Sequence, residues 1–135
     1  MKVAYEVMLV ESAARSSSGD SGPMGGYANI SDVALQLDVT AGSGTLDVYL
    51  QTSFDDGATW QDVGHFPQMT AAGRRVLSTH EPAATAGDVS SATFAGSDKS
   101  LAADTVSPIR LGDLIRVAWV IAGSFTFSVD AVARS

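Results

Sequence analysis

Few residues of this chain have types that do chemistry, and their spacing does not form a catalytic or metal-binding arrangement. The histidines, His65 and His80, do not have the spacing of paired metal ligands such as H-x-x-x-H. The chain has no cysteine, which excludes thiol nucleophiles, disulfides and thiolate metal sites. Asp55 and Asp56 are adjacent acids, but no acidic residue follows at the bidentate position of an EF-hand loop. We therefore expect no catalytic, cofactor-binding or metal-binding residues, and no cofactor.

One short motif resembles a catalytic one, but the rest of the sequence does not support a catalytic role for it. Residues 19–23, Gly-Asp-Ser-Gly-Pro, are similar to the nucleophile motif of chymotrypsin-like proteases. Those proteases supply a histidine base upstream of the serine, and no histidine precedes Gly19. A Ser/Gly-rich loop explains the segment without catalysis.

Residues 53–60, Ser-Phe-Asp-Asp-Gly-Ala-Thr-Trp, match the Asp-box pattern S-x-D-x-G-x-T-W. The fixed positions are Ser53, Asp55, Gly57, Thr59 and Trp60. Asp55 can accept backbone N–H bonds across a turn, and Gly57 can adopt a left-handed conformation without steric cost. Trp60 can then pack on the adjoining sheet. In sialidase-like propellers the motif recurs once per blade, away from the active site. The motif therefore predicts a structural turn in a hairpin.

The charge of the chain is unevenly distributed. The formal net charge is −7, and residues 16–73 contain no Lys or Arg. The acids of that stretch are Asp20, Asp32, Asp38, Asp47, Asp55, Asp56 and Asp62. Binding to phosphate backbones or to anionic membranes needs clustered basic residues, so we expect neither nucleic acid nor membrane as a partner. The stretch predicts an acidic, solubilising face.

Hydrophobic residues alternate with polar ones along most of the chain, which is the pattern of β-strands with one buried face. The clearest runs are 33–40, 46–51 and 125–130, and the run 113–121 is apolar on both faces. Short glycine-containing segments at 41–45 and 122–124 predict antiparallel hairpins. Strands are expected near 3–11, 27–30, 33–40, 46–53, 59–66, 74–80, 106–110, 113–121 and 125–133. We predict one all-β domain over 1–135, an antiparallel two-sheet β-sandwich of jelly-roll or immunoglobulin-like type.

Two segments lack the strand pattern: the Ser/Gly-rich residues 12–26 and the Ala/Ser/Gly-rich residues 83–104. Long loops of this kind are binding loops or disordered segments. One interpretation is exposed surface. Another is an arm that orders against a neighbouring subunit, with Met24, Phe94 and Leu101 as assembly contacts. A third is local pairing of 89–94 as an extra strand.

Aromatic residues offer weak support for sugar binding. Trp60 and Trp119 are expected in the core because of their motif and strand settings. Tyr49 lies on the polar phase of its strand and is the best candidate for an exposed aromatic. His65 is expected at the surface, next to Phe66.

The order of segments resembles a group of small β-sandwich virion proteins of tailed bacteriophages and prophages. The resemblance rests on a strand ending in Glu-Ser-Ala-Ala-Arg at 11–15, Leu-Asp-Val-Thr at 37–40, Gly-Thr-Leu-Asp-Val at 44–48, Gln-Thr-Ser-Phe-Asp-Asp-Gly-Ala-Thr-Trp-Gln-Asp-Val at 51–63, Phe-Pro-Gln-Met-Thr-Ala-Ala-Gly at 66–73 and Ile-Arg-Val-Ala-Trp-Val-Ile-Ala-Gly-Ser-Phe-Thr-Phe-Ser-Val at 115–129. The chain departs from the usual pattern at 122–125 and at 83–104. The resemblance implies assembly into a shell or tail, and it brings no catalytic residues.

These observations lead to one main functional hypothesis and three alternatives. The main hypothesis is a non-enzymatic virion protein, made in the host cytoplasm, that decorates or cements a capsid by binding the major capsid protein. The resemblance also implies a homo-oligomer in the assembly. The alternatives are a head-completion or tail structural protein, a carbohydrate-binding module and an enzyme. The enzyme alternative lacks any pairing of histidine with an acid in the sequence.

Overall fold

The computed structural model describes residues 4–79, 98–107, 109 and 111–134. Their strands are β1 (Ala4–Arg15), β2 (Gly19–Asp20), β3 (Asp32–Ser53), β4 (Gln61–His65), β5 (Gly73–Ser78), β6 (Thr105–Val106) and β7 (Leu114–Arg134). All pairings among these strands are antiparallel, and the described residues contain no helix. The predicted all-β antiparallel, sandwich-like fold is confirmed. No helix among the described residues is long and apolar enough to span a membrane.

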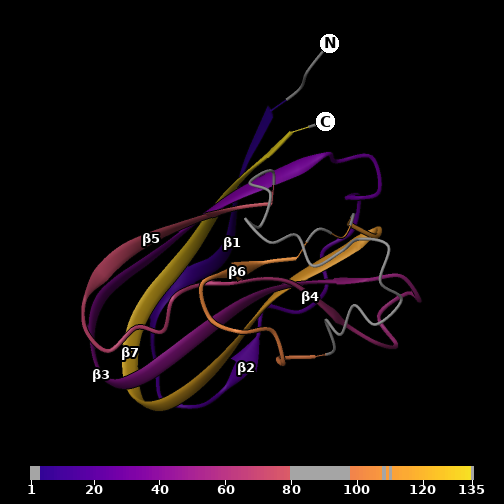
Figure 1. The fold of residues 1–135 in the computed structure, drawn as a ribbon. Coiled ribbons are helices and arrows are strands. Elements are labelled where there is room, and N and C mark those ends of the chain that lie inside the picture. The colour runs from indigo at the N-terminus through magenta and orange to yellow at the C-terminus, as the bar shows by residue number, and fades with distance from the viewer. Residues whose placement is uncertain (1–3, 80–97, 108, 110, 135) are drawn as a thin grey trace.

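Two long strands organise the molecule. β3 and β7 pair along their whole length, from Asp32 opposite Arg134 to Ser53 opposite Leu114, and they curve together from one layer into the other (Figure 1). In the first layer their outer neighbours are β1 and β5, which gives the strand order β1-β7-β3-β5. In the second layer the order is β2-β7-β3-β4-β6. Each layer therefore uses a different half of the same two strands.

The predicted hairpins at 41–45 and 122–124 are wrong, because these two segments pair with each other inside the β3–β7 ladder. Gly44 lies opposite Gly123, and both have positive φ angles, 102° and 111°. A Cβ atom on Gly44 would lie 1.8 Å from the Ala122 carbonyl oxygen, and one on Gly123 would lie 2.1 Å from the Ser43 carbonyl oxygen. Glycine permits this close approach and this backbone conformation at a bend. The glycines therefore mark a bend within two paired strands.

The core lies between the two layers. It includes Leu35 and Phe127 from the first layer and Leu50 and Val117 from the second, all fully buried. Trp119 is buried as expected, and its ring meets Phe127 edge-on with the ring centroids 5.5 Å apart. The alternation of apolar residues thus identified correctly which aliphatic and aromatic side chains of β3 and β7 form the core.

The structure corrects the expected 12–26 loop. β1 continues to Arg15, and the following residues line the edge of β7, with Gly19 opposite Trp119 and reciprocal backbone hydrogen bonds of 2.9 Å between Met24 and Ile115. Residues 27–30, expected as a strand, instead form a turn closed by a bond from Ile30 N to the Tyr27 carbonyl oxygen. Backbone hydrogen bonds to β7 hold the Ser/Gly-rich segment in place, because its small side chains contribute little apolar surface.

Candidate functional site

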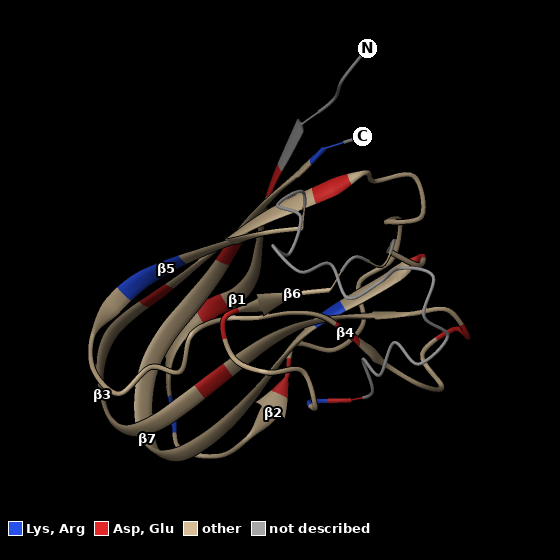
Figure 2. Cartoon of the chain, viewed as in Figure 1, with Lys and Arg blue, Asp and Glu red and all other residues tan. Residues whose placement is uncertain are grey.

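The acidic residues do not form one face. In Figure 2 they are spread over both layers and the connecting turns. Asp62 is fully buried, and the carboxylates of Asp32 and Asp47 are mostly buried and lie within 4 Å of basic side chains, Arg134 and His65 respectively. The predicted acidic face is therefore wrong for these three residues. Part of the negative charge therefore lies inside the molecule, where these carboxylates accept hydrogen bonds or lie beside basic side chains.

The 53–60 turn is held by side-chain bonds to its own backbone. The Asp55 carboxylate accepts bonds from Thr59 N at 2.8 Å and Thr59 Oγ1 at 2.5 Å, and also from Ser53 Oγ at 2.8 Å. Ser53 Oγ accepts a bond from Gly57 N at 2.8 Å, and Gly57 has a φ of 90°. Trp60 was expected in the core but is only half-buried, and the Arg116 guanidinium lies over its ring at 4.4 Å from the centroid. All bonding partners of Asp55 lie within the turn, which is an arrangement for holding backbone.

We expect the turn to make folding stability depend on acid pH. Bonds from Thr59 and Ser53 lower the pKa of Asp55 below its usual value, because they favour the ionised carboxylate. The folded pKa is below the unfolded one, so this stabilisation is present above the unfolded pKa and is lost as pH falls through the folded pKa. Urea unfolding from pH 7 down to pH 2 should show a steeper acid loss of stability in the wild type than in Asp55→Asn. Equal slopes would contradict the role assigned to Asp55.

A buried carboxylate holds the segment 98–101 against β4. Asp62 Oδ1 accepts a bond from Lys99 N at 2.9 Å, and Oδ2 accepts bonds from Ser100 N at 2.7 Å and Leu101 N at 2.8 Å. The Gln51 amide donates a fourth bond to Oδ1 at 2.8 Å. Successive backbone N–H groups converging on one carboxylate satisfy its lone pairs away from water. The network thus anchors the described end of the 83–104 segment to its own domain.

The same network continues to Arg116, whose side chain is mostly buried, and to Asp98 at the surface. Gln51 donates a second bond, to Asp98 Oδ1 at 2.7 Å, and accepts one from Arg116 Nε at 2.7 Å. Burial raises the pKa of Asp98, but bonds from Gln51 and Lys99 and the charges of Lys99 and Arg116 outweigh it, so the pKa lies below its usual value. The charged groups therefore neutralise one another locally.

His65 is buried, which corrects its expected surface position. Its Nε2 lies 3.0 Å from Asp47 Oδ1, its Nδ1 lies 2.8 Å from the Leu101 carbonyl oxygen, and its ring stacks on Tyr49 at 3.9 Å. Tyr49 is therefore also buried, and the prediction that it is an exposed aromatic is wrong. Because both ring nitrogens face acceptors of the same chain, neither is directed to a substrate in this arrangement.

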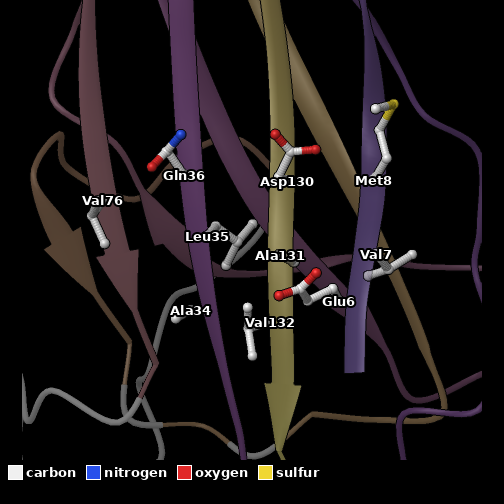
Figure 3. A pocket seen from close by; sticks show the side chains of 10 residues that line it. All are labelled: Glu6, Val7, Met8, Ala34, Leu35, Gln36, Val76, Asp130, Ala131 and Val132. Atoms are coloured by element: carbon white, nitrogen blue, oxygen red, sulfur yellow. The ribbon is translucent and has the colours of Figure 1, made fainter. Parts of the chain in front are cut away.

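The outer face of the first layer carries a groove of about 480 Å³. Figure 3 shows one row of side chains across it, from Val76 on β5 through Gln36 and Asp130 to Met8 on β1. Met8 and Val76 are 60% and 70% exposed and form the two rims. Glu6 lies on the same face, one row away. The groove is lined mainly by apolar side chains, and its ionisable groups are the carboxylates of Glu6 and Asp130.

The residues predicted as assembly contacts have different positions. Met24 is half-buried and packs on the core of its own domain. Leu101 is half-buried, and its backbone binds Asp62 and His65. Phe94 and His80 lie outside the described residues. The described residues contain no cluster of three or more His, Cys, Asp or Glu side chains able to hold a metal.

Sequence reasoning missed the network around Asp62. Gln51 and Asp62 are polar residues in strands, and their partners in the 98–101 segment lie 37 to 47 residues further along the chain. The sequence pattern offered little indication of this network, because polar residues that alternate with buried apolar ones in a strand are ordinarily expected to face solvent.

Comparisons with known proteins leave the family open. No protein-family model matches the sequence, and no curated protein matches it. Among solved structures, a chain of "Structure of infectious bursal disease virus Gx strain" is similar over 99% of this chain, with a TM-score of 0.47 and 11% sequence identity. This chain spans 33% of the length of that one.

Proposed function

We propose that this protein is a non-enzymatic structural component of a bacteriophage virion, a decoration or cement protein that binds the major capsid protein. The observation that carries the proposal is that the buried and turn-forming polar side chains are bonded within the chain itself. The groups best suited to chemistry, Asp62, His65 and Asp55, bind their own chain. Among the described residues, no other element covers the outer face of the first layer, and this face carries a groove rimmed by Met8 and Val76.

Two further points support a structural role in a virion. The resemblance of the segment order to small phage virion proteins points to a shell or tail. The net charge of −7 favours an outer surface over contact with packaged DNA. The carbohydrate-binding alternative lost its main candidate when Tyr49 proved to be buried under His65.

The proposal predicts that particles carry the protein in a fixed, high ratio to the major capsid protein. Purified protein added to particles that lack it should bind and raise the temperature at which the shell breaks. Particles that already carry the protein serve as the control, because their sites are occupied and they should not respond. Quantitative mass spectrometry, cryo-electron microscopy and thermal release of DNA provide the measurements.

Other results would favour the alternatives. A copy number equal to that of a single ring, with density at the portal or tail, would replace decoration by a head-completion or tail role. Binding to a glycan array together with no affinity for particles would favour the carbohydrate-binding module.

A further inference from the structure

The groove on the outer face of the first layer has apolar rims and a negatively charged floor. Met8 on β1 and Val76 on β5 form the rims and are 60% and 70% exposed. Gln36 on β3 and Asp130 on β7 complete the row of side chains between them, and Glu6 lies one row away (Figure 3). An occupant of this groove therefore needs an apolar group at each end and a group of positive charge in the middle.

Two carboxylates on this face have no cation beside them. Asp38, which faces outward from β3, pairs with Arg74 at 3.4 Å. Within the part of the chain that the structure describes, no basic side chain lies within 4 Å of the exposed residues Glu6 and Asp130. These two acids are diagonal neighbours on adjacent strands, so their Cβ atoms are about 7–8 Å apart. One cation of a partner can therefore reach both carboxylates.

The length of the row matches a short extended segment. Met8 and Val76 lie on the first and last strands of the first layer, three strand spacings or about 14 Å apart. In an extended chain, residues i and i+4 point to the same side about 13 Å apart, with residue i+2 between them. Apolar residues at i and i+4 then meet the two rims, while residue i+2 lies above Gln36 and Asp130. A segment that crosses the strands at a right angle presents its side chains in this way, as in orthogonal sheet packing.

We propose that this groove binds an extended segment of a partner protein in which a Lys or Arg lies between two apolar residues, in the pattern apolar-x-Lys/Arg-x-apolar. The basic side chain lies between the carboxylates of Glu6 and Asp130, and the apolar side chains cover Met8 and Val76 and remove them from water. The contact uses side chains of the sheet face and needs no backbone bond at a sheet edge. It deepens the proposed function and rests on it for a protein partner. The peptide test below uses no particles, so either can fail alone.

Titration of the ¹⁵N-labelled full chain with short capped peptides, followed by NMR, tests the contact. The probe is the peptide Leu-Ser-Lys-Ser-Leu, and we expect saturable shifts of the amides of Met8, Gln36 and Asp130 and none in the second layer. The control peptides are Leu-Ser-Glu-Ser-Leu, which reverses the charge, and Ser-Ser-Lys-Ser-Ser, which lacks the apolar contacts. Each should bind about tenfold more weakly than the probe. No saturable shift with the probe, or equal affinities for the three peptides, would overturn the proposal.

Variants of the two carboxylates test the charge. Glu6→Gln with Asp130→Asn should lower the affinity for the probe about tenfold. Glu11→Gln is the matched control, because Glu11 is an exposed acid of β1 outside the groove, and it should bind like the wild type. Glu6→Lys with Asp130→Lys should reverse the preference, so that the peptide with Glu binds more tightly than the one with Lys. An unchanged affinity in the first variant, or a preference that does not reverse in a folded lysine variant, would contradict the contact.

Variants of the rims test the apolar contacts and the other possible occupant, a second copy of this chain. Met8→Ser with Val76→Ser should weaken binding of the probe about tenfold. Val120→Ser, which changes an exposed valine on the second-layer half of β7, should leave it unchanged. Sedimentation velocity of the full chain without peptide should show a monomer. Self-association that the rim variant abolishes and Val120→Ser preserves would assign the groove to a second copy and overturn the proposal.

Discussion

Replacing Gly44 or Gly123 by alanine will destabilise the fold by about 3–5 kcal/mol, through a steric clash added to a strained backbone. The new methyl group would meet a carbonyl oxygen of the opposite strand at 1.8 Å in the first case and 2.1 Å in the second. Neither neighbour is a flexible side-chain end, so β3 and β7 must separate at the bend that joins the two layers. Equilibrium urea unfolding, followed by tryptophan fluorescence, measures the loss.

Gly26→Ala is the matched control for this effect. Gly26 also has a positive φ, 91°, but nothing lies within 4 Å of where its Cβ would be. Its substitution therefore has the conformational cost without the clash, about 1–2 kcal/mol. Equal losses at Gly26 and Gly44 would show that the close approach at the bend contributes nothing.

The same glycines show why the fold class could be predicted and the strand connections could not. Alternation is a local property, so Leu46 and Val48 or Phe125 and Phe127 identify a buried face without knowledge of the partner strand. A Gly-Ser-Gly segment has the same local chemistry in a turn as in a bend within a strand. What decides between them is a partner strand opposite, and here that partner lies about eighty residues along the chain.

The sequence pattern changes at this bend, but the change is one that a hairpin would also produce. The aliphatic core positions of β3 are odd from Val33 to Val39 and even from Leu46 to Leu50. The change of phase is taken up by a register shift between Val39 and Ala41, where β3 passes from the first layer to the second. A bulge of this kind bends a strand and re-aims its side chains. A hairpin accommodates a change of phase equally well, which is why the pattern alone favoured the wrong connection.

The polar network could be predicted even less. Asp62, Gln51 and His65 have the sequence signature of solvent-facing strand positions, yet all three are buried. Residues 98–101 cover this face of the second layer, and that covering is a tertiary property of a segment with little apolar content. The residue types nonetheless explain the contact. The two oxygens of a carboxylate can accept hydrogen bonds from several backbone N–H groups of a short segment that has few apolar side chains.

Asp62→Asn should therefore be among the most damaging conservative substitutions in this chain, with a loss of about 2–3 kcal/mol. The amide keeps the shape of the side chain but offers one acceptor oxygen in place of two, and it turns an NH₂ group toward backbone N–H donors. At least one amide among Lys99, Ser100 and Leu101 then loses its partner. Asp113→Asn is the control, since Asp113 is exposed, and its effect should be within about 0.5 kcal/mol.

Hydrogen exchange by NMR gives a readout besides global stability: the three amides should exchange faster in Asp62→Asn, while those of β3 and β7 at the bend should not change in the folded state. Unchanged protection at all three amides would mean that contacts other than Asp62 hold the 98–101 segment on the second layer.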